Sequence, residues 1–319
     1  MTGRQDSSRR HTLPATKETT HTGFFDNSLP PVLRIAPGDT VVTETLMLLE
    51  GKLAPGMSLD EVNALRNAVR AKGRSSHTLT GPIYVEGAEP GDALEVRIRR
   101  LVPYDYGVHY VLPGALGAGT LPEDFPEGHV VDIRWTEQDP TIRFAPGIEF
   151  PAKPFLGVMA VAPPEAGEVS STAPGPHGGN LDLKELGAGA TLFLPIFVPG
   201  ALFSVGDAHA AQGDGEVSGT ALETGVKELV LQFNVRKDMH LRRPLVETST
   251  HWITMGFHPD LDEAAKMALR DAVEWISLRT GLSALQAYSL SCMAVDMRVT
   301  QLVDGNKGIH AMIPKEVVR

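Results

Sequence analysis

The sequence contains a single cysteine, Cys292, among its 319 residues. Without a second cysteine the chain cannot form an intramolecular disulfide, so nothing in it requires an oxidising compartment. Cys292 has the apolar neighbours Met293, Ala294 and Val295, which favours a buried core thiol over a reactive nucleophile. The cysteine count excludes small folds that are held together by disulfides.

Basic residues are also scarce, with 29 Lys and Arg against 39 Asp and Glu and a formal net charge of −10. Phosphate binding needs concentrated Lys and Arg, so no nucleic-acid partner is expected. The chain has no run of about eighteen consecutive apolar residues, and no apolar segment follows the basic residues between Arg4 and Lys17. We therefore expect no signal peptide, no membrane partner and a cytoplasmic location.

Several familiar catalytic and nucleotide-binding motifs are absent. The sequence has no Walker loop and no Gly-x-Gly-x-x-Gly motif that opens a helix after a strand. The serine pairs at 75–76 and 170–171 lack a nucleophile elbow and a Gly-Ser-rich amidase signature. Serine-based hydrolysis and dinucleotide chemistry are not indicated.

The remaining composition favours short strands joined by turns. Hydrophobic residues make up 42% of the chain, which is enough for a core, and 32 glycines and 24 prolines supply turns. Apolar and polar residues alternate as in half-buried strands at Leu94–Ile98 and Leu229–Val235, and Thr191–Val198 is continuously apolar. The stretch 103–130 shows no periodicity and is predicted to be a long irregular loop.

Helical patterns occur in two places. Ser58 with Glu61 three residues later fits a capping box ahead of an apolar stripe. Asp260 can cap a longer helix that ends near Gly281, and a short second helix is predicted around Ala284–Leu290.

Together these patterns predict a mainly β fold, with a β-sandwich-like or barrel-like core and a smaller C-terminal α+β portion. Residues 1–20 are expected to be a poorly ordered polar lead-in. Residues 21–256 are expected to form the β-rich core, with two β subdomains dividing near residue 150 as an option. Residues 257–319 are expected to form the α+β subdomain, with strands near 294–302 and 308–313.

Polar residues and glycines are densest in two segments, His177–Asp182 and Gly206–Glu216. Each segment holds two polar residues at i and i+2, which point to the same face if the backbone is extended; these pairs are Asn180 with Asp182 and Asp207 with His209. Brought together, the pairs offer an imidazole nitrogen and carboxylate oxygens. That ligand set suits zinc or a similar divalent ion, with calcium as a second choice.

Glycines in the same segments let backbone approach a small ligand closely. Gly179 and Gly206, with Asn180, are therefore candidates for substrate contact. The simpler interpretation is that Asp and Asn beside Gly are turn residues. Elsewhere, His77 could be a metal ligand, an acid–base group or a loop histidine, and Glu86 could be a general base or an ordinary strand-end charge.

Longer strings in these regions resemble the acetamidase/formamidase family. The strings that carry the resemblance are Thr80–Ala88, Pro90–Asp92, Gly179–Lys184 and Leu194–Glu216. The resemblance extends over nearly the whole chain from about residue 10, and the chain length resembles the shorter, acetamidase-like branch. It implies a β-rich fold, a homo-oligomer, and metal-assisted hydrolysis of short-chain amides such as formamide or acetamide.

The site hypothesis that follows places a divalent metal on Asp182, Asp207 and His209, with His77 as an optional further ligand. Glu216 or Glu86 would act as the proton carrier. Two alternatives stay open: a metal-dependent hydrolase of another small C–N or ester substrate, and a non-catalytic β-sandwich module that binds a small polar ligand.

Overall fold

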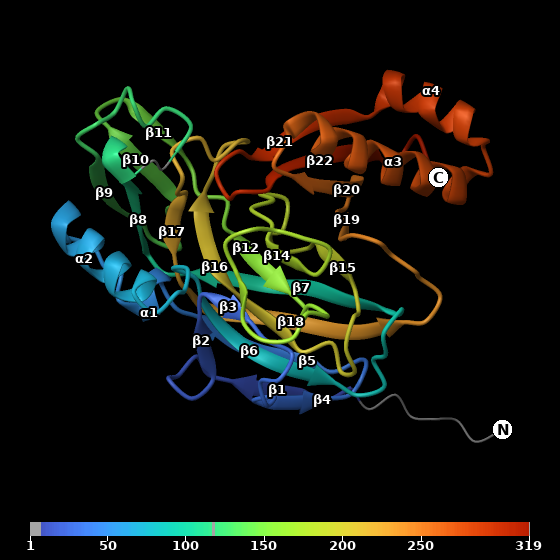
Figure 1. Cartoon of the computed structure of the whole chain (residues 1–319), viewed down its shortest axis with the longest axis horizontal. Helices are drawn as coiled ribbons and strands as arrows, with labels where there is room; N and C mark the ends of the chain where they lie inside the picture. The colour runs from blue at the N-terminus through green and yellow to red at the C-terminus, as the bar shows by residue number, and fades with distance from the viewer. Residues whose placement is uncertain (1–7, 117–118, 319) are drawn as a thin grey trace.

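The structure, a computed structural model, describes residues 8–116 and 119–318 (Figure 1). Within those residues two nine-stranded sheets make up most of the molecule. The prediction of a mainly β fold with a small C-terminal helical portion is confirmed.

The first sheet runs through most of the chain and is antiparallel except where its first two strands pair. Its strands, in spatial order, are β1 (Arg10–Leu13), β5 (Thr40–Thr45), β18 (Val226–Arg236), β7 (Ala93–Pro103), β15 (Thr191–Pro195), β19 (Leu245–Glu247), β20 (His251–His258), β22 (Lys307–Pro314) and β21 (Asp296–Gln301). The last two strands, β22 and β21, come from the predicted α+β subdomain. That segment therefore extends the first sheet and does not build a separate one.

The second sheet carries the segments that the sequence singled out. Its main path is β14 (Gly178–Asn180), β12 (Phe155–Ala160), β16 (Phe203–Ala211), β17 (Leu222–Thr224), β8 (Tyr106–Val111) and β9 (His129–Arg134). Strand β6 (Thr78–Val85) pairs with β16, and it also pairs with β2 (Thr20–Thr22) and β4 (Leu33–Ile35). Two small sheets are added: β10 (Thr141–Ala145) with β11 (Ile148–Pro151), and β3 (Phe24–Phe25) with β13 (Val169–Ser170).

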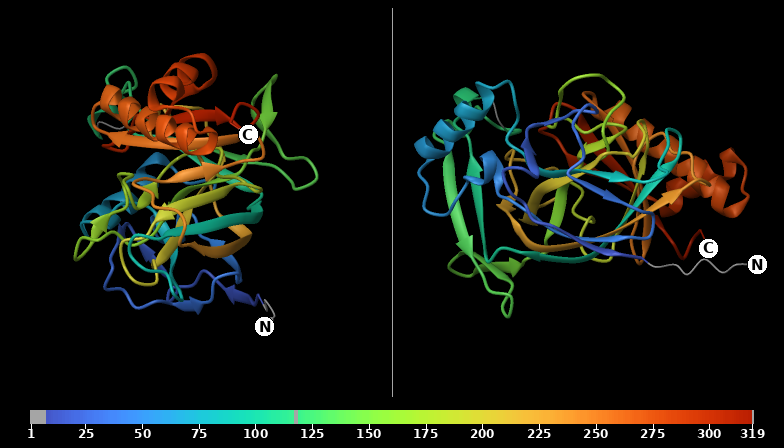
Figure 2. Two further views of the ribbon diagram at one scale, coloured as in Figure 1. Left: turned by 90° about the vertical axis from the view of Figure 1, so that its right-hand side faces the viewer. Right: turned by 90° about the horizontal axis from the view of Figure 1, so that it is seen from below.

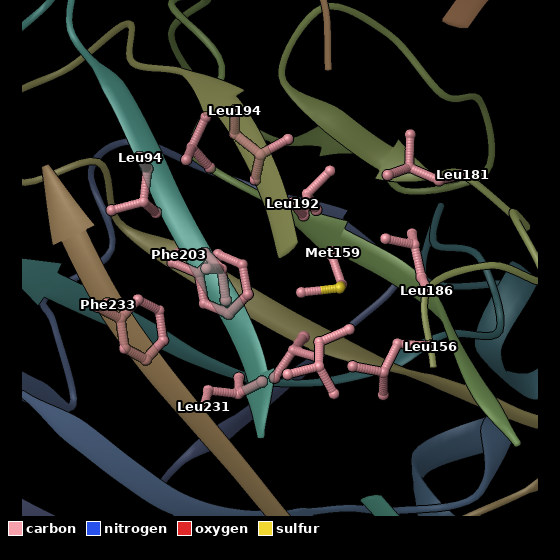
Figure 3. Close-up of a cluster of buried hydrophobic side chains, with 14 of the residues drawn as sticks. Leu94, Leu156, Met159, Leu181, Leu186, Leu192, Leu194, Phe203, Leu231 and Phe233 are labelled. Atoms are coloured by element: carbon pink, nitrogen blue, oxygen red, sulfur yellow. The ribbon is translucent and has the colours of Figure 1, made fainter. Parts of the chain in front are cut away.

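The main hydrophobic core lies between the two large sheets (Figure 3). Leucines of β7 and β15 meet apolar residues of β12 and β16, and the rings of Phe203 on β16 and Phe233 on β18 pack edge to face with centroids 5.2 Å apart. This packing explains the alternation in the sequence, because every second residue of β18 points into the core.

Helices cover opposite ends of the molecule (Figures 1 and 2). At one end lie the short α1 (Leu48–Gly51), α2 (Leu59–Arg70) and the one-turn η1 (Gly114–Leu116), and at the other α3 (Leu261–Thr280) and α4 (Ala284–Ala294). The predicted capping box at Ser58 and Glu61 is present, and Gly281 closes α3 in the left-handed conformation at φ 74°. No helix in the described ranges is long and apolar enough to cross a membrane.

Three local predictions differ from the structure. Residues 10–13 of the expected lead-in form β1, because they pair with β5, whereas residues 1–7 lie outside the described ranges. The stretch 103–130 contains β8 and the first two residues of β9, and these strands pair with each other over six residue pairs. Cys292 is exposed on α4 and is not a core thiol. In each of the three cases, the observed structure depends on pairing or packing partners that are distant in the sequence.

Candidate active site

A buried cluster of carboxyl groups surrounds one histidine on an interior strand of the second sheet. His209 on β16 is 1% exposed, and its Nε2 lies 3.4 Å from Asp207 Oδ2 and 3.2 Å from Glu223 Oε2. On its other side, Nδ1 lies 3.9 Å from Asp182 Oδ1, and Glu216 is also within ligand distance of that pair. Strands β12, β14, β16 and β17, which carry or flank these residues, are neighbours in Figure 1.

The acidic residues of the cluster have unusual backbone. Asp182, Asp207 and Glu216 have φ values of 47°, 55° and 45°, in the left-handed region that costs most residues about 1 kcal/mol or more. Simple alternation along an extended strand therefore does not explain why Asp207 and His209 converge. The left-handed turn at Asp207 directs its carboxylate to His209, and strain of this kind is concentrated at functional sites.

Gly157 on β12 makes room for this arrangement. A Cβ at Gly157 would lie 2.5 Å from Asp207 Oδ2, 2.7 Å from Asp182 Oδ1 and 2.7 Å from the Asp207 carbonyl oxygen. The Gly157 carbonyl also accepts the N–H groups of Leu181 and Asp182. The two aspartates therefore face each other across a position where only glycine fits.

We expect Gly157→Ala to lower the free energy of unfolding by about 1–3 kcal/mol, the usual range for overpacking, and to displace both aspartates. Thermal denaturation would measure the first effect, and a crystal structure of the variant would show the second. Gly213→Ala is the matched control, because a Cβ there meets nothing within 4 Å. An active, equally stable Gly157→Ala protein would contradict the packing argument.

The orientation of His209 is fixed by Gln212. The Gln212 amide nitrogen donates to the Asp182 carbonyl oxygen at 2.9 Å, so its oxygen faces His209 Nδ1, also at 2.9 Å. Because that oxygen can only accept, Nδ1 carries a proton. Phe155 packs edge-on against the imidazole with centroids 5.0 Å apart. The other nitrogen, Nε2, is thereby aimed between Asp207 and Glu223.

The carboxyl groups of Asp207 and Glu223 favour a positive charge at His209 Nε2, which lies between them. Burial alone would lower the pKa of His209, but Glu223 and Asp207 outweigh it and hold that pKa well above its usual value. Burial would raise the pKa of Asp207, yet His209 and His77 bring it down to about 2. In the chain alone a proton on Nε2 supplies the charge, and a divalent cation would supply it in the same place.

A second group of carboxyls has raised pKa values. Burial and then Glu216 raise the pKa of Asp182 well above its ordinary value, and burial and then Asp304 do the same for Glu216. Loss of surrounding water raises the pKa of Asp304 itself to about 7. Neighbouring carboxylates repel each other, so ionising one of them disfavours ionising the next, as in paired carboxyls of active sites.

Unpartnered atoms show that this donor set fits a cation. Both Asp182 carboxylate oxygens, Glu223 Oε2 and Asn180 Oδ1 are buried without a hydrogen-bond partner in the described residues. Two groups of three ligand atoms form around His209, one with Asp207 and Glu223, the other with Asp182 and Glu216. Imidazole with carboxylate oxygens is a ligand set for zinc and related divalent metals.

The cluster lies between two cavities. One, of about 750 Å³, is bounded by Gln212 and Glu216 and by apolar side chains that include Phe144 and Phe150. The other, of about 490 Å³, is bounded by His77, Tyr110 and Asp304. Both volumes are in the range of small-molecule sites.

A profile of the acetamidase/formamidase family matches residues 8–169 and 165–319, which together span almost the whole chain. The chain belongs to the acetamidase/formamidase family. A formamidase of Methylophilus methylotrophus is 25% identical, with 91% of this chain and 87% of that protein covered. An acetamidase of Mycolicibacterium smegmatis is 27% identical, and the match spans 60% of this chain and 59% of that acetamidase.

A solved structure of an acetamidase from Bacillus halodurans has the same fold. It superimposes with a TM-score of 0.85 at 31% identity, covering 96% of this chain and 98% of that one. The resemblance stated from the strings around Gly206–Glu216 thus agrees with both the family profile and a shared fold.

Within this family fold, the other predicted site residues lie in different places. His77 is buried ahead of β6, and its Nδ1 is 2.9 Å from Ser171 Oγ. Glu86 is at the far end of β6, 55% exposed, and 3.6 Å from Arg34, so it is not brought to the cluster. Gly206 leaves room for the Thr78 carbonyl oxygen, 2.3 Å from where its Cβ would be, which is a strand-packing role.

Gly179 and Asn180 remain beside the cluster. A Cβ on Gly179, at φ 94°, would approach His177 Nε2 to 3.3 Å, and Asn180 is buried opposite Val158 of β12. Neither borders the two cavities described above.

Two members of the candidate site were not found from the sequence. Glu223 is a single charge between Leu222 and Thr224 in the short buried strand β17, and that isolation was the available signal. Asp304 lies before Gly305 in the loop between β21 and β22. Backbone bonds between Gly215 and residues 300–302 bring its loop to Glu216, which no local pattern reveals.

Proposed function

We propose that this chain hydrolyses short-chain aliphatic amides, of the formamide and acetamide type, to a carboxylate and ammonia with the help of a divalent metal, zinc in the first instance. The observation that carries the proposal is the buried group Asp207, His209 and Glu223, in a chain of the acetamidase/formamidase family. Names of relatives support the reaction class, and the donor set supports the metal.

We place the metal on Asp207, His209 and Glu223. His209 offers its free Nε2 to this group, whereas the group with Asp182 would need Nδ1, which already donates to Gln212. Glu223 thus takes the ligand position that the sequence hypothesis gave to Asp182. When bound, the ion would acidify a water and polarise the amide carbonyl.

The second carboxyl group would handle protons. Glu216 borders the larger cavity and belongs to the cluster, so it can reach both a water and an amide nitrogen. Asp182 and Asp304 lie next to it with raised pKa values, so a proton on one of them could replace the one that Glu216 delivers. A proton carrier with a raised pKa suits both halves of the reaction, because it must accept a proton from water and donate one to the leaving amine.

Purified protein should release ammonia from formamide, acetamide and propionamide, with turnover falling steeply for bulky and aromatic amides. Prolonged chelation should abolish that release, and added zinc should restore it. Full activity after verified metal removal would eliminate the metal from the proposal. Cleavage of small esters in place of amides would favour the alternative hydrolase.

A homo-oligomer and a cytoplasmic location remain proposals. Self-association is supported by the β10–β11 hairpin, on which Phe144, Ile148 and Phe150 are between 41% and 55% exposed. Exposed apolar groups of this kind are typical of association surfaces.

A further inference from the structure

The smaller cavity has a basic wall that the proposed amide hydrolysis does not use. Arg66 and Arg70 on α2 both border it, one helical turn apart. Two like charges at i and i+4 repel each other and destabilise a helix unless an anion or carboxylate lies between them. The two arginines nevertheless lie on the same wall of the cavity.

Nearby basic residues are paired, but these two are not. Arg74 bonds to Glu168 and Lys72 pairs with Glu50. Within residues 8–116 and 119–318, neither Arg66 nor Arg70 has a carboxylate within ion-pair distance. The Nη1 atom of Arg66 is buried without any hydrogen-bond partner. A buried guanidinium donor left unbonded is costly, so a ligand that accepts its hydrogen would be favoured.

The same cavity reaches the carboxyl cluster. His77, Tyr110 and Asp304 form its inner boundary. Burial and Glu223 raise the pKa of the Tyr110 hydroxyl, whereas Arg66 acts to lower it, so that hydroxyl is influenced by both the basic wall and the cluster. One molecule in the cavity can therefore contact the arginines at one end while its other end lies beside His77 and Asp304, next to the carboxyl cluster.

We propose that the substrate is a short-chain amide with a carboxylate at its far end, a monoamide of a small dicarboxylic acid, and that Arg66 and Arg70 bind that carboxylate. This inference rests on the proposed amide hydrolysis. Guanidinium groups match carboxylates in shape and charge and can bind them through two hydrogen bonds. Acetamide consists only of a methyl group and the reacting amide, and so leaves the basic wall without a ligand.

The test compares two pairs of amides that differ at one end. Malonamate has a carboxylate where propionamide has a methyl group, and succinamate differs from butyramide in the same way. We expect wild-type kcat/KM to be higher for the acidic member of at least one pair. In Arg66→Gln that preference should fall by about 10-fold to 100-fold, with propionamide turnover within about twofold of wild type.

Further variants keep the result interpretable. Arg70→Gln, at an exposed position, should reduce the preference without affecting folding, and Arg66→Lys should retain part of it. Lys72→Gln removes the same charge outside the cavity and should change nothing. Propionamide turnover without preference for malonamate or succinamate, or an equal loss for both members of a pair in Arg66→Gln, would overturn this inference alone. No turnover of any amide would instead count against the proposed function.

Discussion

Glu223→Gln is expected to lose its metal and nearly all turnover. Glu223 Oε1 accepts the Ala221 N–H at 2.9 Å, and Oε2 faces His209 Nε2 without a hydrogen-bond partner of its own. Gln can keep the first bond, so the strand should remain in place, but its amide places a donor where an anionic ligand is needed. Even the loss of an outer contact lowers metal affinity by about 10-fold to 100-fold, and a direct ligand should matter more. Elemental analysis after dialysis, with ammonia release, gives both readouts.

The metal content of Asp182→Asn would distinguish the two candidate groups of metal ligands around His209. Under the proposed assignment it should keep its metal, because Asp182 belongs to the group that would need the Nδ1 nitrogen occupied by Gln212. If Asp182→Asn lost the metal while Glu223→Gln retained it, the ion would belong with Asp182, His209 and Glu216.

Glu216→Gln should keep the fold and the metal, and lose about 10²–10⁴-fold in turnover, the usual contribution of a general acid–base group. Gln has the shape of Glu but cannot carry the proton. The backbone conformation at Glu216, φ 45°, comes from the turn that Gly215 and the β21–β22 loop hold, so the substitution should not disturb it. Steady-state ammonia release, metal content and thermal denaturation separate these effects.

Glu86→Gln provides the matched control for Glu216→Gln. It removes the same charge at an exposed position whose side chain contacts Arg34. Its effect on stability should be within about half a kcal/mol, and its turnover should be unchanged. A dead Glu86→Gln beside an active Glu216→Gln would return the proton-carrier role to Glu86 and would contradict the arrangement of the site.

Much of the fold was predictable because its signals are local. The capping box at Ser58, the left-handed cap at Gly281 and the alternation at Leu229–Val235 each depend on neighbours within a few residues. The strand at 10–13, and β8 with the start of β9 in 103–130, were missed for the opposite reason. Their hydrogen-bond partners come from distant or irregular segments, so no short window contains the cause.

The candidate site likewise has residues that could be predicted from the sequence and residues that could not. The sequence by itself determined that Asp207, His209 and Glu216 belong together, because they lie within one glycine-rich string. Only the tertiary structure brought in Glu223 from β17, Asp304 from the β21–β22 loop and the space at Gly157, and it placed Glu86 elsewhere. The positions of the candidate ligands depend on which strands pair and in which register. Register is set by long-range packing, which cannot be inferred from the spacing of residues in the sequence.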